Sequence, residues 1–494
     1  MKLRTSLLLT LPLVMAIAGC TAVGPMKLAA SYGGVFGDPD KMINTSPFLR
    51  PGLPPPAPPP AMTCTPAPCA LPNVDASAGT TMAINETPIA VNPLNPKQMI
   101  TGSNDWNCNG RFLGFWTSGS GGKRWSGGCV QSLQGASLAG DPIAGYDLNG
   151  TLYQGGVDLN SNGVVVVASS TDNGQTWSNP VVAINFPNQL ADKPWLAIDT
   201  NANSPNRNNL YISNTMYGEG TTIYVTTSKD GGQTWNSVAV SGHAFFPEIN
   251  QLSDLAIGSD GTVYLTYLHC TTAGNTGDCG GTVGTMYFQK SADAGTTWSA
   301  PAAVDTPTLA PHCSNQHSLF GCLPNTTMIV SNIPSIGVDN SGGKHDGNLY
   351  VCDYNWAGSY MQVQVKTSTD GGSTWSAPAP VAPNTDTHDQ FFQWLSVAPD
   401  GKVGVTWMDR RNDPANISYE AFGTWSSDGG KTFNTHNIQI GKKSSNPSNN
   451  GLSPAFLGDY AGNAWAGSKK LIASWADTRN GSYAQDYIGG LQLQ

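Results

Sequence analysis

The chain has 494 residues, of which only 12% are charged, and it carries a formal net charge of −9 with no run of lysine or arginine. A chain without a basic patch is not expected to bind nucleic acid. Its 57 glycines, with abundant Asn, Ser and Thr, favour many tight turns and therefore an exported all-β protein.

The first 20 residues are predicted to be an export signal. Lys2 and Arg4 give a basic start, and the apolar stretch that follows is too short to span a bilayer comfortably. The segment ends in Ile17-Ala18-Gly19-Cys20, which resembles a bacterial lipobox. The resemblance implies lipidation of Cys20 and a lipid anchor at the cell envelope, in the outer membrane if the source is Gram-negative. An ordinary cleaved secretory signal is the alternative.

Residues 21–72 are predicted to be a tether. The run from Pro51 to Pro60 is dense in proline and favours an extended, polyproline-like spacer. The remaining residues, 73–494, then form the folded domain.

The ten cysteines fit an oxidising compartment. With Cys20 set aside, proximity along the chain suggests the pairs Cys64–Cys69, Cys108–Cys129, Cys270–Cys279 and Cys313–Cys322. Cys352 lies in an apolar strand and is expected to be a buried thiol. No pair has CxxC spacing, so neither a zinc site nor any other cofactor is predicted.

An eight-residue pattern, S-x-D-x-G-x-T-[WF], recurs along the chain and indicates a repeat architecture. Its Asp can cap the backbone of its own turn, its Gly permits positive φ, and its aromatic residue can be buried under a hairpin. The copies are STDNGQTW (170–177), SKDGGQTW (228–235), SADAGTTW (291–298), STDGGSTW (368–375), SSDGGKTF (426–433) and a degenerate SGSGGKRW (118–125).

This pattern resembles the Asp-box of the sialidase-like β-propellers, and the resemblance extends from about Asn85 to the end of the chain. It implies an all-β propeller of four-stranded blades with the motif at the turn between the third and fourth strands. It also implies a structural role for the motif's carboxylates, because these turns lie on the face away from the usual active site. They are Asp172, Asp230, Asp293, Asp370 and Asp428.

Seven blades can be counted from the strand patterns. Candidate inner strands run from Ile89–Asn92 to a weaker one near Tyr460, and the last unit lacks a fourth strand. Residues near Val74–Ala83 are predicted to supply it and so close the ring, which would leave no exposed edge. Catalytic sialidase domains have six blades, so a six-bladed fold remains the alternative.

The loops opposite the repeated turns are expected to converge on the axis, which makes that face the default binding site. They contain a concentration of charged and aromatic side chains: Glu86, Asn104, Asp105, Arg111, Asp141, Asp158, Asp192, Lys193, Trp195, Tyr217, Glu219, Glu248, His269, Asp353, Trp356, His388, Asp389, Trp394, Asp409, Arg410, Arg411, Asp413, Asp459, Tyr460, Asp477 and Arg479. Arginines facing carboxylates suit recognition of an anionic sugar.

The resemblance to sialidases implies three arginines for the substrate carboxylate, an Asp acid/base and a Tyr nucleophile assisted by Glu. Arg111, Arg411 and Arg479 fit the triad, and Asp409, Asp477 and Trp394 are further substrate contacts. Asp105 fits the acid/base, Tyr460 the nucleophile and Glu248 its base. Alternatively, Asp409–Arg410 and Asp477–Arg479 are salt bridges between blades.

Two functions remain open from the sequence. The first is a sialidase-like glycoside hydrolase that acts on terminal sialic acid or a related acidic sugar. The second is a non-catalytic propeller that binds glycans or protein at the envelope. The second is favoured by Asn85-Glu86-Thr87-Pro88, which stands where sialidases have Phe/Tyr-Arg-Ile-Pro. A monomer is expected in either case, with a glycan as partner and the lipid anchor as its only contact with the membrane.

Overall fold

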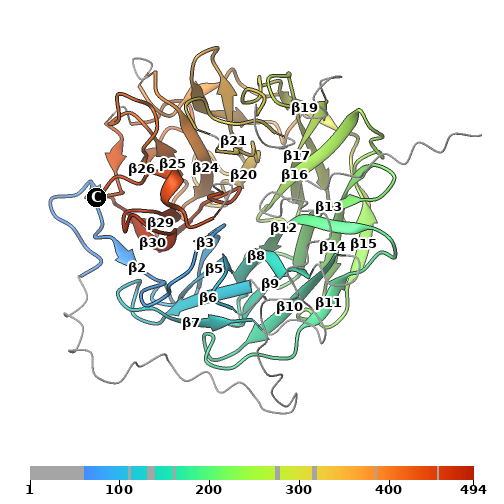
Figure 1. Ribbon diagram of the computed structural model, residues 1–494. Coiled ribbons are helices and arrows are strands. Elements are labelled where there is room, and N and C mark those ends of the chain that lie inside the picture. Colours follow the sequence, from blue (N-terminus) through green and yellow to red (C-terminus); the bar gives the residue numbers. More distant parts are fainter. Residues whose placement is uncertain are drawn as a thin grey trace, which may run out of the picture.

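The computed structural model describes residues 61–494 except 109–112, 131–138, 159–162, 273–278, 314–319, 327, 384–386, 435 and 453–455. Seven antiparallel sheets are arranged in a ring around a central axis (Figure 1). The prediction of a seven-bladed all-β propeller is therefore confirmed, and the six-bladed alternative is excluded.

The first three blades follow one another along the chain. Blade 1 contains β3 (Ile84–Asn85), β4 (Ile89–Val91), β5 (Met99–Asp105), β6 (Leu113–Ser118) and β7 (Ser126–Cys129). Blade 2 contains β8 (Ala139–Tyr146), β9 (Leu152–Asp158), β10 (Val164–Ser170) and β11 (Val181–Ile184). Blade 3 contains β12 (Leu190–Ile198), β13 (Leu210–Tyr217), β14 (Thr221–Ser228) and β15 (Asn236–Ala239).

The next three blades repeat this order. Blade 4 contains β16 (Glu248–Ile257), β17 (Val263–Thr271), β18 (Thr285–Ser291) and β19 (Ala302–Asp305). Blade 5 contains β20 (Ser335–Val338), β21 (Leu349–Trp356), β22 (Met361–Ser368) and β23 (Ala379–Pro380). Blade 6 contains β24 (Gln390–Val397), β25 (Val403–Asp409), β26 (Glu420–Ser426) and β27 (Ile438–Gln439), and a short 3₁₀ helix, η2 (Pro447–Asn449), follows it.

Blade 7 joins the two ends of the chain. It contains β28 (Gly462–Trp465), β29 (Lys470–Asp477) and β30 (Gln485–Gln492), and β30 also pairs with β1 (Cys69–Ala70) and β2 (Val74–Asp75). Closure through Val74 is confirmed, but the closing strand already begins at Cys69. The folded domain thus extends N-terminal to the predicted boundary at residue 73, because Met62 and Leu71 are buried in the core next to blades 1 and 7.

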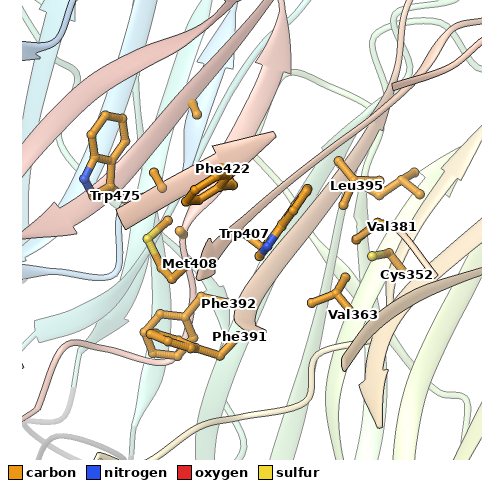
Figure 2. Packing of buried hydrophobic residues seen from close by; sticks show 14 of the residues in the cluster. Cys352, Val363, Val381, Phe391, Phe392, Leu395, Trp407, Met408, Phe422 and Trp475 are labelled. Atoms are coloured by element: carbon orange, nitrogen blue, oxygen red, sulfur yellow. The ribbon is translucent and has the colours of Figure 1, made fainter. Parts of the chain in front are cut away.

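The blades are held together by apolar side chains between their faces. In the largest cluster, Cys352 and Val363 of blade 5, Trp407 of blade 6 and Trp475 of blade 7 belong to one continuous core (Figure 2). The second strand of each blade lies inside such layers, and every residue of β25 is buried. This burial explains why β25, which reads Val-Gly-Val-Thr-Trp-Met-Asp, shows no strict alternation of apolar and polar residues.

The repeated eight-residue turns join the third and fourth strands of blades 2 to 6, as predicted. In all five, the Ser hydroxyl donates to the Asp carboxylate at 2.7–2.8 Å and the Thr hydroxyl donates to it at 2.5–2.7 Å. The turns also contact the preceding blade. Gly372 has φ +85°, and a Cβ there would lie 2.1 Å from the ring of Phe288, so only glycine fits.

The four predicted disulfides, Cys64–Cys69, Cys108–Cys129, Cys270–Cys279 and Cys313–Cys322, are all present. Cys352 is a buried free thiol, also as predicted. Four disulfides indicate an exported protein, because such bonds persist in oxidising compartments. In the described part of the chain, we find no helix with the length and apolarity needed to cross a membrane.

Candidate functional site

The inner strands of four blades are kinked near the axis. The pairing register shifts after Gly140, Asp192, Gln251 and Phe391. At each kink one residue has positive φ, namely Asp141 (51°), Lys193 (50°), Leu252 (60°) and Phe392 (50°). Such backbone is costly for a residue with a side chain, on the order of 1–3 kcal/mol, and is found where surrounding contacts enforce it, often at functional sites.

Charged side chains from four blades meet at these kinks in a group that we call the axial cluster. The ammonium of Lys193 lies 2.8 Å from Asp459, 3.1 Å from Asp141 and 3.7 Å from both Glu86 and Asp192. All five side chains are buried, and that of Lys193 is only 3% exposed. One cation therefore faces four carboxylates in a setting of low dielectric constant, where charge interactions are strong.

The cluster separates the protonation states of its carboxyl groups. Burial raises the pKa of Glu86 well above its ordinary value despite the nearby Lys193. Burial also favours the neutral form of Asp141, but Lys193 and hydrogen bonds outweigh it and lower the pKa of Asp141. Burial raises the pKa of Asp192 to about 8. Carboxyl groups whose pKa values are shifted in opposite directions thus lie side by side, an arrangement typical of acid/base pairs.

Hydrogen bonds from neighbouring blades fix the orientation of the cluster. Asn104 donates to Glu86 at 2.8 Å and accepts from the backbone N–H of Asp141 at 2.8 Å. Gln251 donates to Asp192 at 2.5 Å, and Ser331 donates to Asp459 at 2.5 Å. The arrangement is therefore positioned by at least five blades.

Tyr460 lies against this cluster. Its hydroxyl donates to the carbonyl of Pro142, the residue after Asp141, at 3.2 Å. Its ring meets Trp195 edge to face at 5.4 Å, and Trp195 in turn lies 4.2 Å from Trp394. Burial and the adjacent carboxylates raise the pKa of Tyr460 well above its ordinary value, so the phenol is neutral. Of the residues predicted for catalysis and substrate binding, Tyr460 and Trp394 lie here.

The predicted acid/base, Asp105, occupies a different environment at the end of β5. It is buried and accepts hydrogen bonds from the backbone and side chain of Asn107, while burial raises its pKa. Ligand atoms of Asp105, Cys108 and Cys129 lie within 4.8 Å of one another. Cys108 and Cys129 are joined in a disulfide, which removes the thiolates that a metal would need.

The predicted base, Glu248, begins β16 and forms an ion pair with His269 at 2.8 Å. Gln251, which does contact the axial cluster, lies three residues further along this strand. At about 3.3 Å per residue, Glu248 is roughly 10 Å from that contact. Glu248 therefore belongs to another part of the face.

Arg411 and Arg479 occupy equivalent positions in blades 6 and 7. Arg411 contacts Asp409 at 2.5 Å and lies 4.4 Å from the ring of Phe422, while Arg479 contacts Asp477 at 2.6 Å and lies 4.0 Å from the ring of Tyr487. Each partner Asp also accepts a hydrogen bond at 2.7 Å from the indole of the Trp two residues before it. Both guanidinium groups therefore lie over the second and third strands of their own blades.

The third predicted arginine, Arg111, lies outside the described residues. Arg410 is fully buried and pairs with Asp389 of its own blade at 3.1 Å. The ion pairs of Arg411 and Arg479 thus lie within their own blades. Arg410 also donates to the carbonyl of Pro324 at 3.3 Å and to the hydroxyl of Thr326 at 3.1 Å, in the segment before blade 5. None of these described contacts brings Arg411 and Arg479 together at the axis.

Sequence reasoning placed Glu86, Asp141, Asp192, Lys193 and Asp459 on the correct loops without giving them a role. One signal could have found them. The chain has only 24 basic residues, and one of them, Lys193, lies between Asp192 and Pro194 at the start of an inner strand. Inner strands are buried, so a charged pair at such a position needs buried partners of its own.

The chain matches no family model. Over 229 residues it is 27% identical to a sialidase of Bacteroides fragilis (strain YCH46), a match that covers 45% of this chain and 35% of the relative. The chain thus spans only about a third of the length of that curated protein.

Among solved structures, a protein of unknown function from Dyadobacter fermentans has a TM-score of 0.46 at 14% identity, covering 72% of this chain and 95% of its own. The leech intramolecular trans-sialidase gives a TM-score of 0.44 at 11% identity, with 67% and 66% covered. The NanB sialidase of Streptococcus pneumoniae gives 0.44 at 10% identity, with 80% and 83% covered. Similarity at this level leaves the function to be argued from the chain's own residues.

Proposed function

We propose that this protein is a sialidase-like glycoside hydrolase that acts on terminal sialic acid or a related acidic sugar of glycans at the cell surface. The observation that carries the proposal is the position of Tyr460, whose hydroxyl donates to the carbonyl of Pro142 next to Asp141, at the axial cluster. In that cluster the pKa of Glu86 is raised and that of Asp141 is lowered. The partial similarity to a curated sialidase supports the choice of substrate class.

The proposed chemistry assigns one role to each group. Tyr460 attacks the anomeric carbon while its phenolic proton passes to the ionised Asp141. Glu86, whose pKa is raised by burial, gives its proton to the oxygen of the leaving sugar as the glycosidic bond breaks. Water then releases the sugar from Tyr460, with the proton transfers reversed. A tyrosine suits an anionic substrate because a neutral nucleophile is not repelled by it.

Lys193 has a positioning role in this scheme. Its ammonium lowers the pKa of Asp141 and also lies 2.8 Å from Asp459. Without that cation, the carboxyl groups would share protons and the separation of acid from base would be lost.

The burial of the axis favours a second candidate function, a propeller that binds glycans without cleaving them. Tyr460 is only 3% exposed and Glu86 is fully buried. Arg411 and Arg479 are held by Asp409 and Asp477, so neither guanidinium is preset for a sugar carboxylate. In this alternative, the axial cluster is a structural centre.

Hydrolysis of a fluorogenic α-sialoside by the purified domain tests the proposal. We expect turnover by the wild type and a loss of at least a hundredfold in kcat for Tyr460→Phe, in line with removal of a catalytic nucleophile. Tyr419→Phe is the matched control, because Tyr419 is equally buried and also donates to a backbone carbonyl, that of Ala476, at 2.7 Å.

Three outcomes distinguish the candidates. Turnover that survives in Tyr460→Phe contradicts the assigned nucleophile. Wild-type protein that binds sialylated glycans without cleaving them supports the second function. Protein that does neither contradicts both.

We further propose that Cys20 carries a lipid anchor and that the proline-rich segment holds the propeller away from the membrane. The four disulfides support export. In a detergent phase-separation assay, we expect the Cys20→Ser variant to partition into the aqueous phase, while its propeller keeps the wild-type melting temperature. A variant that still partitions into the detergent phase contradicts the anchor.

A further inference from the structure

Two consecutive phenylalanines are exposed on the loop that leads from blade 3 into blade 4. The exposed fractions are 59% for Phe245 and 64% for Phe246, and Val283, on the loop between β17 and β18, is 61% exposed. The first loop is held in place because the backbone of Ala244 pairs with that of Thr221 in both directions at 2.9 Å. Large apolar side chains that are fixed in solvent mark a contact surface.

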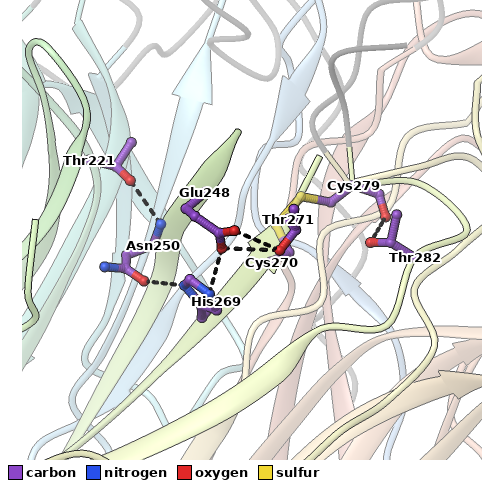
Figure 3. Close-up of a disulfide and its surroundings, with 8 residues drawn as sticks. All are labelled: Thr221, Glu248, Asn250, His269, Cys270, Thr271, Cys279 and Thr282. Carbon is purple, nitrogen blue, oxygen red and sulfur yellow. Dashed lines mark hydrogen bonds and ion pairs between the residues drawn. A yellow bond between two sulfur atoms is a disulfide. The ribbon is translucent and has the colours of Figure 1, made fainter. Parts of the chain in front are cut away.

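A polar group lies on the same turn as these phenylalanines. The backbone N–H of Glu248 donates to the carbonyl of Phe245 at 2.8 Å, so carboxylate and phenylalanine share one turn. Glu248 is 2.8 Å from His269 and accepts from the hydroxyl of Thr271 at 3.0 Å through both oxygens (Figure 3). The side chains of Glu248 and His269 are 42% and 27% exposed, so both can reach a ligand.

Val283 borders the same group from the other side. His269 pairs across the strands with Thr285, two residues after Val283. The disulfide Cys270–Cys279 fixes the strand end between His269 and Thr271. We call the surface formed by Phe245, Phe246, Glu248, His269, Thr271 and Val283 the blade-4 patch.

Hydrogen bonds fix the orientation of the His269 ring. The amide nitrogen of Asn250 donates to the carbonyl of Gly242 at 2.9 Å, so its oxygen must accept from Nδ1 of His269 at 2.8 Å. Nε2 of His269 then faces Glu248 at 2.8 Å. The polar half of the patch is therefore a carboxylate that is held by both His269 and Thr271.

This arrangement does not suit nucleophilic catalysis. The hydroxyl of Thr271 is bonded to the carboxylate, whereas a Ser- or Thr-type nucleophile is bonded to the imidazole that takes its proton. It does suit binding, because fixed polar groups beside exposed aromatic rings are the usual components of a small-ligand site.

We infer that the blade-4 patch is a binding site for a neutral pyranose, separate from the axial cluster. One phenylalanine ring covers the C–H face of the sugar, and Glu248 accepts hydrogen bonds from two neighbouring hydroxyl groups. The carboxylate of Glu248 is more exposed than its partner His269. That carboxylate would repel an acidic sugar, so the site takes an uncharged hexose of a glycan.

Saturation-transfer NMR with the methyl glycosides of galactose, glucose, mannose and N-acetylglucosamine tests this inference on the purified protein. We expect at least one of them to bind in the millimolar range. Phe246→Ala and Glu248→Gln should each raise its Kd by about tenfold or more, the effect of losing a stacking surface or a charge-assisted hydrogen bond. Leu94→Ala is the control, because Leu94 is similarly exposed at 60% in the turn between β4 and β5.

The inference can fail without affecting the proposed hydrolase, because the readout is binding and not turnover. Tyr460→Phe should keep the wild-type Kd for the hexoside, and Phe246→Ala should keep the wild-type kcat on the sialoside. The absence of saturation transfer from all four glycosides, or an unchanged Kd in both patch variants, overturns the site. A dimer in sedimentation that Phe246→Ala dissociates would show instead that the patch binds a second copy of the chain.

Discussion

The repeated turns and the axial cluster are built from the same residue type, Asp, and use it in opposite ways. Each turn carboxylate is exposed or partly exposed and is bonded only within its own eight residues, and hydrogen bonds lower the pKa of Asp230, Asp293 and Asp370 to about 2. In the axial cluster, Glu86 and Asp192 are buried, contact residues of other blades and have raised pKa values.

The difference lies in repetition. The turns recur with the same sequence and the same hydrogen bonds in five blades, so their task is common to every blade and therefore structural. At the axis, the kinks place Asp141, Lys193, Leu252 and Phe392 in corresponding positions. The backbone kink recurs at these positions, but the side chains there differ from blade to blade. Such positions can carry residues that serve one site and not the fold, and the axial cluster lies at them.

The largest effect should come from Lys193. Lys193→Met removes the only described cation among four buried carboxyl groups, and we expect a loss of about 3–5 kcal/mol of unfolding free energy in guanidinium denaturation. Lys402→Met is the control, because Lys402 forms an exposed pair with Asp400 and should cost less than about 1 kcal/mol. Equal losses of unfolding free energy in the two variants would show that Lys193 stabilises the fold no more than a lysine in a surface ion pair does.

Asp486 provides a test of burial without a cation. It accepts hydrogen bonds from Thr101 at 2.8 Å and Ser474 at 2.9 Å, faces Asp75, and burial raises its pKa to about 7. The folded state then holds a proton that the unfolded state releases near pH 4, so this contribution to stability is full below pH 4 and is lost as the pH rises to 7.

Asp486→Asn should therefore gain stability relative to the wild type between pH 4 and pH 7, by roughly 1.4 kcal/mol per pH unit at most. Asp230→Asn is the opposite case, because the pKa of Asp230 is lowered to about 2 and its contribution is lost only as the pH falls below 4. Denaturation curves across pH measure both, and a difference for Asp486→Asn that does not vary with pH would contradict the shift.

Arg479 tests whether a repeated ion pair is structural, as the turns are, or part of a binding site, as the axial cluster is proposed to be. Its contacts with Asp477 and Tyr487 repeat those of Arg411 with Asp409 and Phe422, which resembles the turns more than the axis. Arg479→Ala should lower the unfolding free energy by about 1–3 kcal/mol through the lost charged hydrogen bonds. We expect the affinity for a sialoside to be unchanged, and a stable variant with affinity reduced tenfold or more would instead place Arg479 in the binding site.

The fold could be predicted from the sequence because its signals are local. The turn pattern spans eight residues, and the four disulfides join cysteines at most 21 residues apart. The axial cluster depends on closure of the ring, which brings Glu86 to Asp459 across 373 positions. No local pattern records which inner-strand side chains meet once seven blades close, so the roles assigned to Asp105 and Glu248 could not be derived from the residues around them.

Removal of a turn carboxylate should have a smaller effect than any change at the axis. Asp428 accepts from Ser426 at 2.7 Å, from the backbone of Thr432 at 3.0 Å and from its hydroxyl at 2.6 Å. Asp428→Ala should lower stability by about 1 kcal/mol, the usual cost of a lost capping side chain, and leave turnover unchanged. Loss of activity without a change in melting temperature would give the turn a function.

The smallest expected effect is a gain, in the degenerate turn of blade 1. Ser120 stands where the other turns have Asp. Its hydroxyl accepts from the backbone N–H of Arg124 at 2.9 Å and lies 3.2 Å from the hydroxyl of Ser118. The hydrogen bond of the conserved turn serine is kept, because Ser118 still accepts from the backbone N–H of Gly122 at 3.1 Å. Ser120→Asp adds a carboxylate that can accept from both Ser118 and the backbone of Arg124. We expect a gain of roughly 0.5 kcal/mol, since two net hydrogen bonds at the surface are offset by the cost of fixing the side chain. Ser120→Ala is the matched control and should lose stability by a similar amount. If Ser120→Asp instead destabilises the propeller, the turn in blade 1 does not tolerate the Asp that the other turns carry. Repetition of the turn sequence would then be insufficient to identify the structural carboxylates.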